Sequence, residues 1–102
     1  MIIYNVTCNL DPQIADEWLR WMLNEHIPKV METGCFDSFK VLKLLSNAED
    51  DMGINYAMQY STSSMERYAE YRDNFAPALQ LHTKEKYGES VLAFRSLLEE
   101  IM

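Results

Sequence analysis

The chain of 102 residues carries nine lysines and arginines against sixteen aspartates and glutamates, a formal net charge of −7. This deficit of basic residues argues against binding to nucleic acid or to an anionic membrane surface, because both partners need a basic face. No apolar run approaches the roughly 20 residues of a membrane-spanning helix. We expect one domain over residues 1–102, located in the cytoplasm because no signal-peptide pattern precedes the first apolar residues. Cys8 and Cys35 are expected to be free, buried thiols.

The first apolar segment alternates with the period of a β-strand. We expect its even-numbered residues to pack under helices, and its odd-numbered residues to meet water, a partner or a ligand. The even face carries Ile2, Tyr4, Val6, Cys8 and Leu10, and the odd face carries Ile3, Asn5, Thr7 and Asn9.

A helix is predicted to follow at once. Asp11 is a favoured N-cap, and Pro12 at the first helical position gives up an N–H that would lack a partner there. Pro28 predicts a kink or a restart near residue 27, and Gly34 can end the helix in a left-handed conformation. The inner stripe of this helix is expected to carry Ile14, Trp18, Trp21, Met22 and Glu25, with Leu19 and His26 at its flank.

The middle of the chain predicts two more strands. Residues 36–45 read as a long strand, and an acidic turn over residues 47–53 leads into a third strand that starts at Ile54. This third strand divides into an apolar and a polar face in the same way as the first. The likeness predicts that the two strands are central neighbours in one sheet.

The last third of the chain repeats the strand, helix and strand order. Ser63 and Glu66 form a capping-box pattern, Pro77 interrupts the helix, and Gly88 ends it before a fourth strand over residues 90–98. The inner stripe of this helix is expected to carry Met65, Tyr68, Ala69, Arg72, Phe75 and Ala76.

Two strand–helix–strand units of this kind predict one four-stranded sheet with the helices on one face, because such crossovers are right-handed. The bare face should then be covered by a second copy of the chain in a two-fold dimer, whose two sheets form a barrel. The alternative is a monomer with a solvated face. We expect the open face to carry Ile3, Asn5, Thr7, Asn55, Ala57, Gln59, Val91, Ala93, Arg95 and Leu97.

Four segments, 1–7 (MIIYNVT), 26–34 (HIPKVMETG), 76–80 (APALQ) and 93–98 (AFRSLL), resemble a bacterial family of uncharacterised, domain-of-unknown-function proteins of similar length. The resemblance implies a ferredoxin-like βαββαβ fold, of the α+β class with an antiparallel sheet, within the dimeric α+β barrel group. That group includes cofactor-free monooxygenases, haem-degrading enzymes, chlorite dismutase-like proteins and small isomerases. Because the family itself has no established activity, the resemblance implies a fold and a dimer rather than a reaction.

His26 and Arg95 are the candidate catalytic residues. A histidine beside a proline-disturbed turn suits proton transfer, although it can equally be a structural residue that closes the kink. Arg95 in the middle of a strand can clamp a carboxylate or phenolate with its planar fork, or form an ion pair across the dimer.

Four further residues are candidates for ligand binding: Trp18, Trp21, Tyr56 and Arg72. The aromatic residues could line a flat slot between helices and sheet, although such residues at this spacing also fill cores. Two histidines and two distant cysteines give no metal-ligand spacing, and three glycines form no phosphate loop. We therefore expect neither a metal nor a cofactor.

The sequence does not establish whether the protein is an enzyme. It predicts a homodimeric small-molecule-binding or assembly protein, whose ligand would be small and apolar or aromatic. The alternative is a cofactor-free, monooxygenase- or isomerase-like enzyme that acts on a small aromatic or enone-like substrate with His26 as acid or base.

Overall fold

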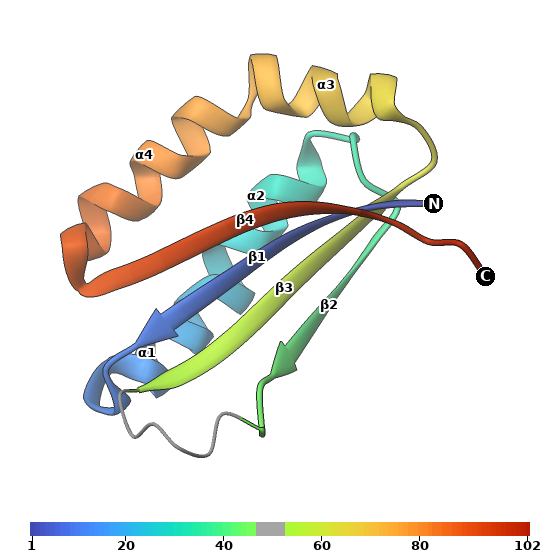
Figure 1. Cartoon of the computed structure of the whole chain (residues 1–102). Helices are drawn as coiled ribbons and strands as arrows, with labels where there is room; N and C mark the ends of the chain where they lie inside the picture. The colour runs from blue at the N-terminus through green and yellow to red at the C-terminus, as the bar shows by residue number, and fades with distance from the viewer. Residues whose placement is uncertain (47–52) are drawn as a thin grey trace.

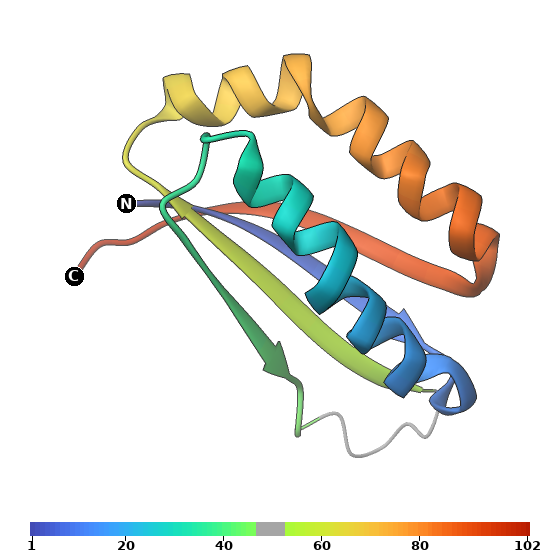
Figure 2. The same cartoon turned by 180° about the vertical axis from the view of Figure 1, so that it is seen from behind.

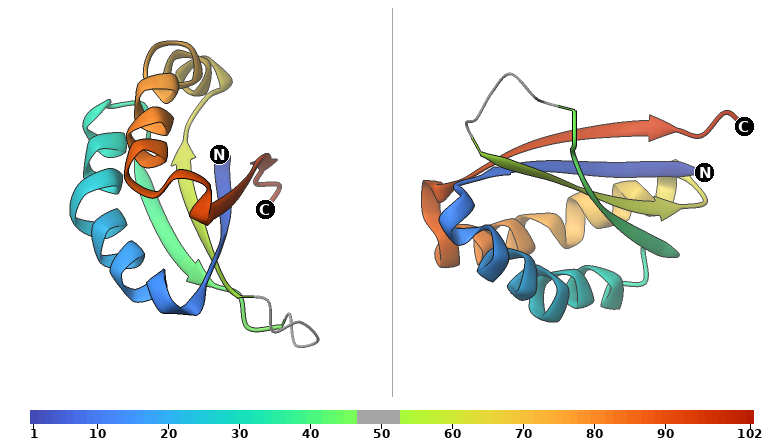
Figure 3. Two further views of the ribbon diagram at one scale, coloured as in Figure 1. Left: turned by 90° about the vertical axis from the view of Figure 1, so that its left-hand side faces the viewer. Right: turned by 90° about the horizontal axis from the view of Figure 1, so that it is seen from below.

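The computed structural model describes residues 1–46 and 53–102, which form an antiparallel four-stranded sheet with helices on one face (Figures 1 and 2). The sheet order is β2-β3-β1-β4. The end-on view shows both helical segments on the same side of the sheet (Figure 3). This α+β architecture confirms the prediction. Its elements are β1 (Ile2–Leu10), α1 (Pro12–Trp21), η1 (Met22–His26), α2 (Ile27–Glu32), β2 (Ser38–Lys43), β3 (Ile54–Thr62), α3 (Met65–Asn74), α4 (Ala76–Tyr87), η2 (Gly88–Ser90) and β4 (Val91–Glu99).

The first helical segment begins and ends as predicted. The Asp11 side chain accepts a hydrogen bond from the Gln13 backbone N–H at 2.8 Å. Pro28 has no N–H to donate, and the chain widens into the π-helical turn η1 before α2 restarts at Ile27. Gly34 follows with φ of 76°, a conformation that favours glycine. The restart was predicted, whereas the π-helical turn was not.

The core lies between the sheet and the helices. The predicted alternation of β1 and β3 is confirmed, since residues two apart along each strand are buried against the helices. The Trp18 ring stacks on Tyr56 with centroids 5.8 Å apart, and Phe36 meets Tyr71 edge-on at 4.9 Å. The buried apolar strand residues are Tyr4, Cys8 and Leu10 of β1 and Tyr56, Met58 and Tyr60 of β3. Cys8 and Cys35 are both free and buried, as predicted.

The expected orientation of β4 is wrong. Arg95 pairs in register with Val6, and Ala93 pairs with Cys8, so both residues lie on the face that the helices cover. Apolar residues occupy both alternating sets of this strand, and the hydrophobic pattern therefore could not distinguish its two faces. The open face of β4 instead carries Leu92, Phe94, Ser96 and Leu98, opposite Asn9, Thr7, Asn5 and Ile3 of β1.

Two predictions about strand and helix limits also differ from the structure. The second strand is shorter than residues 36–45, because Phe36 is buried and Asp37 pairs with Arg67 at 2.9 Å before β2 begins. The cap of α3 is Ser64 rather than Ser63, and its side chain accepts from the Arg67 backbone N–H at 3.2 Å. The predicted acidic turn falls largely on residues 47–52, outside the described residues.

The predicted inner stripes of the helices are wrong at three polar or flexible residues. Met65, Arg72 and Glu25 are exposed. In α3 the buried residue is Tyr71, one position before Arg72, because a ring gains more from burial than a guanidinium does.

Candidate functional site

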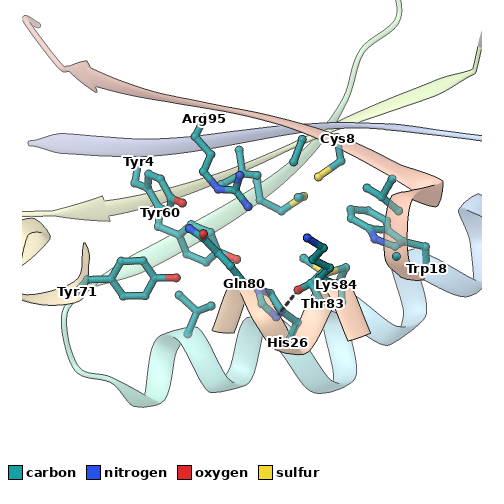
Figure 4. Close-up of a pocket in the computed structure, with 17 residues that line it drawn as sticks. Tyr4, Cys8, Trp18, His26, Tyr60, Tyr71, Gln80, Thr83, Lys84 and Arg95 are labelled. Atoms are coloured by element: carbon teal, nitrogen blue, oxygen red, sulfur yellow. Dashed lines mark hydrogen bonds between the residues drawn. The ribbon is translucent and has the colours of Figure 1, made fainter. Parts of the chain in front are cut away.

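A cavity of about 320 Å³ lies between the helix-covered face of the sheet and the helices. Figure 4 shows its wall, to which β1, β3 and β4 contribute from the sheet side and α1, η1, α2, α3 and α4 from the helix side. The break between α3 and α4 at Phe75 redirects the chain, so that α4 forms one side of this cavity. The fold thus leaves a hollow in the layer where a continuous core would otherwise be.

The floor of the cavity is aromatic and apolar. The side chains of Tyr4, Tyr60 and Tyr71 line it, and their hydroxyl groups point into the space (Figure 4). Burial raises the pKa of all three hydroxyls, an effect that the positive charge of Arg95 partly opposes at Tyr4 and Tyr71. The hydroxyls therefore remain protonated at neutral pH and can donate hydrogen bonds into the cavity.

The exposed residues of the wall are polar and carry positive charge. Arg95 descends from β4 and Lys84 rises from α4 into the same space, with Gln80 one turn before Lys84 (Figure 4). No aspartate or glutamate of the described part of the chain lies among the lining residues. Within residues 1–46 and 53–102, the ion pairs join other residues, Arg67 with Asp37 and Arg72 with Asp73. Among the residues that the structure describes, the cavity therefore holds two cations and no carboxylate that pairs with them.

His26 forms part of the helical wall. Its Nδ1 lies 3.2 Å from Thr83 Oγ1 of α4, and its ring stacks on Trp21 with centroids 5.7 Å apart. Burial, together with the nearby His82 and Arg95, lowers the pKa of His26 to about 4. The imidazole is therefore neutral at physiological pH and can accept or donate a hydrogen bond, but it adds no charge to the cavity.

Cys8 and Trp18 complete the inner wall. Burial raises the pKa of the Cys8 thiol to about 12, so it is not a thiolate at neutral pH. The indole Nε1 of Trp18 is buried and has no hydrogen-bond partner in the described part of the chain. No group of three or more histidine, cysteine, aspartate or glutamate side chains that could hold a metal occurs among those residues either.

The predicted site residues fall into three groups. His26, Arg95 and Trp18 line the cavity, although Arg95 reaches it from the face opposite to the one expected. Trp21 lies behind His26, and Tyr56 belongs to the core; neither lines the cavity. Arg72 lies on the exposed side of α3, where its Nε donates to Asp73 at 2.9 Å.

Three lining residues of α4 were missed by the sequence analysis: Gln80, Thr83 and Lys84. Their spacing of three and four residues places them on one side of a helix, which is the signal that could have identified them.

No helix of the described residues is long and apolar enough to cross a membrane.

Comparison with known proteins gives a family and a fold. Residues 1–101 match the family described as a domain of unknown function, DUF4286. No curated protein matches the chain. A solved structure of an ethyl tert-butyl ether d (EthD) family protein from Bacillus halodurans is similar, with a TM-score of 0.68, 14% identity, and coverage of 99% of this chain and 100% of that one.

A dimeric ferredoxin-like protein from an uncultured marine organism has a TM-score of 0.59 and 12% identity, with coverage of 99% of this chain and 95% of that one. At these identities the likeness shows the fold alone, which is ferredoxin-like. The family match over nearly the whole length shows that this chain belongs to the DUF4286 family.

Proposed function

We propose that this protein binds a small molecule with a flat, apolar or aromatic body in the cavity between α4 and the sheet. The observation that carries the proposal is the cavity itself, about 320 Å³ with an aromatic floor and polar side chains that converge on it. Ligand sites typically start near 300 Å³ and combine apolar walls with a few convergent polar side chains. Since an apolar cavity of about 150 Å³ holds benzene, this one has room for roughly two fused rings.

The proposal extends to a homodimer formed through the open sheet face. Leu92, Phe94 and Leu98 of β4 are 58%, 67% and 44% exposed on that face, which is unusual for large apolar side chains side by side. Beside them lies a polar row, in which Asn5 accepts from Gln59 at 3.2 Å. A two-fold copy would cover both features. One of the structurally similar proteins is described as dimeric, which supports this arrangement.

The alternative of a pure assembly protein is supported by the same open face but leaves the cavity without a role. A protein that served only in assembly would be more stable if larger side chains filled this cavity, because empty volume in a core lowers the free energy of unfolding. The cavity therefore favours binding over assembly.

A second candidate is a cofactor-free enzyme in which His26 accepts a proton from a small aromatic or enone-like substrate. The observation in its favour is that His26 is neutral and lies on the cavity wall. For any compound that the wild-type protein converts, His26→Ala should then abolish turnover and leave the melting temperature nearly unchanged. A large loss of stability would instead make His26 a structural residue.

Native mass spectrometry of freshly purified protein tests the binding proposal and the dimer together. We expect a mass near twice 12.0 kDa with a reproducible increment from a bound small molecule. Ala93→Phe, which fills the cavity from β4, should remove the increment, whereas Ala78→Phe on the exposed side of α4 should keep it.

Two outcomes would contradict the proposal. A dimer without an increment, together with no response to aromatic compounds in tryptophan fluorescence, would favour the assembly role. A monomer would rule out the barrel.

A further inference from the structure

We infer that the ligand is a carboxylic acid with an aromatic body, bound as its anion, whose carboxylate lies between Arg95 and Lys84 while the body rests on the tyrosines. This inference rests on the proposed binding function and adds the chemical class of the ligand. It follows from three features of the cavity: its charge, the hydrogen-bond donors that face it, and the order of polar and apolar groups from rim to floor.

The cavity carries positive charge, whereas the chain as a whole has a net negative charge. Acidic residues outnumber basic ones by sixteen to nine, yet two of the nine cations enter this one space, and no carboxylate of residues 1–46 or 53–102 lines it. Arg95 and Lys84 approach from opposite walls, one from β4 and the other from α4 (Figure 4). An anion placed between them would be attracted by both.

The positive charge of Arg95 reaches deep into the cavity. It partly opposes the rise in pKa that burial causes at Tyr4 and Cys8 of β1 and at Tyr71 of α3. At His26 of η1 it adds to the lowering of the pKa by burial. A potential that disfavours protons at all these sites favours a negative charge placed among them. Arg95 is also the side chain whose planar fork fits a carboxylate.

The neutral polar groups of the cavity complement an anion as well. The buried hydroxyls of Tyr4, Tyr60 and Tyr71 are protonated and point into the space, where each can donate to a ligand oxygen. Gln80 adds amide donors near Lys84. A carboxylate has only hydrogen-bond acceptors, so it can accept from all of these groups without placing two donors against each other.

The polar and apolar groups occupy different depths. Arg95, Lys84 and Gln80 are exposed, whereas Tyr4, Met58 and Tyr60 are buried. The rings of Tyr4 and Tyr71 lie 5.7 Å apart at a tilt of 52° and expose aromatic surface to the cavity. A ligand with a ring at one end and a charge at the other therefore enters ring first and leaves its charge at the rim.

The test uses matched pairs of compounds: phenylacetate, indoleacetate and naphthoate, each with its uncharged amide. Trp21→Phe leaves Trp18 as the fluorescent reporter in the cavity wall, and calorimetry gives an independent affinity. We expect each acid that binds to do so about tenfold or more tightly than its amide. The preference should shrink with added salt, since screening weakens the contribution of exposed charges.

Substitutions at the two cations test whether they cause the preference for the acid over its amide. Arg95→Gln and Lys84→Gln should each weaken binding of the acid about tenfold and leave the affinity for the amide unchanged. Lys86→Gln is the matched control, because it removes the same charge from α4 but its Nζ lies over the Tyr87 ring at 5.6 Å, outside the cavity. All three residues are exposed, so the variants should fold, and thermal melts verify this.

The failures of the two proposals differ. Amides that bind as tightly as the acids, or a loss from Lys86→Gln equal to that from Arg95→Gln, would overturn the assignment of a carboxylate and leave the binding function intact. No binding by any acid or amide, with no increment in the native mass spectrum, would overturn the binding function and this inference together.

Discussion

His26 of η1 and Thr83 of α4 join the two helical segments, with Nδ1 and Oγ1 3.2 Å apart. Both residues line the cavity, so this contact is part of its wall. Thr83 Oγ1 also donates to the Leu79 carbonyl at 3.3 Å, which ties the contact to the backbone of α4. This contact holds His26 in a partly buried position, and burial together with the nearby His82 and Arg95 makes its protonation unfavourable.

The buried state of His26 predicts a dependence of stability on pH. Its pKa is 6.5 in a free side chain and about 4 in the folded protein, because of burial and the nearby His82 of α4 and Arg95 of β4. Between these values the unfolded chain binds a proton that the folded protein does not. Stability that is fully present above pH 6.5 is therefore lost as the pH falls towards 4, by up to about 3 kcal/mol.

Urea unfolding of the wild type and of His26→Gln at about pH 7 and about pH 4.5 measures this contribution. All other ionisable groups are the same in the two proteins, so the difference between them isolates His26. The wild type should lose more stability on acidification than the variant. Equal losses would show that His26 titrates in the folded protein as it does in a free chain.

The two tryptophans should differ in their contribution to stability. Trp18 is fully buried and stacks on Tyr56, so Trp18→Ala should lower the free energy of unfolding by about 3–5 kcal/mol. Trp21 is only partly buried, against His26 and His82, and its replacement by alanine should cost less. Urea denaturation of both variants checks the order. A larger loss at Trp21 would mean that the contact between the helical segments, not the core, limits stability.

The sequence was sufficient to predict the fold, because the period-two pattern of β1 and β3 and the breaks at Pro28 and Pro77 are local signals. It was not sufficient for β4. Leu92 and Phe94 on one side, and Val91 and Ala93 on the other, give no period-two contrast. Only the pairing with β1 settles which side faces the helices.

The candidate site was predicted in part for a related reason. His26 beside Pro28 is a local feature, and Trp18 lies on an obvious apolar stripe of α1. Gln80 and Lys84 look like ordinary solvent-facing residues of a polar helix. They become cavity residues because the break at Phe75 sets the direction of α4, and no residue in their own neighbourhood encodes that direction.

Cys8 is predicted to be unreactive although it lines the cavity. Its side chain is buried and burial raises its pKa to about 12, so almost no thiolate exists at neutral pH. Ellman's reagent should modify Cys8 at the rate of unfolding in buffer and at once in concentrated urea, with Cys8→Ser as the control that assigns the signal. Rapid modification in buffer would show that the cavity opens to a molecule of that size without unfolding.

The open sheet face gives the last prediction, since it should hold two copies of the chain together. Phe94 is 67% exposed on that face, opposite Thr7 in the register of β1 and β4. Phe94→Asp places a charge where the second sheet would pack, and burying an unpaired charge is costly. Native mass spectrometry and light scattering should therefore find mostly monomer for this variant and dimer for the wild type. Leu81→Asp is the matched control, because Leu81 is 54% exposed but lies on α4, away from the open face, and this variant should remain dimeric. A dimer that survives Phe94→Asp but is lost with Leu81→Asp would move the interface from the sheet to the helices.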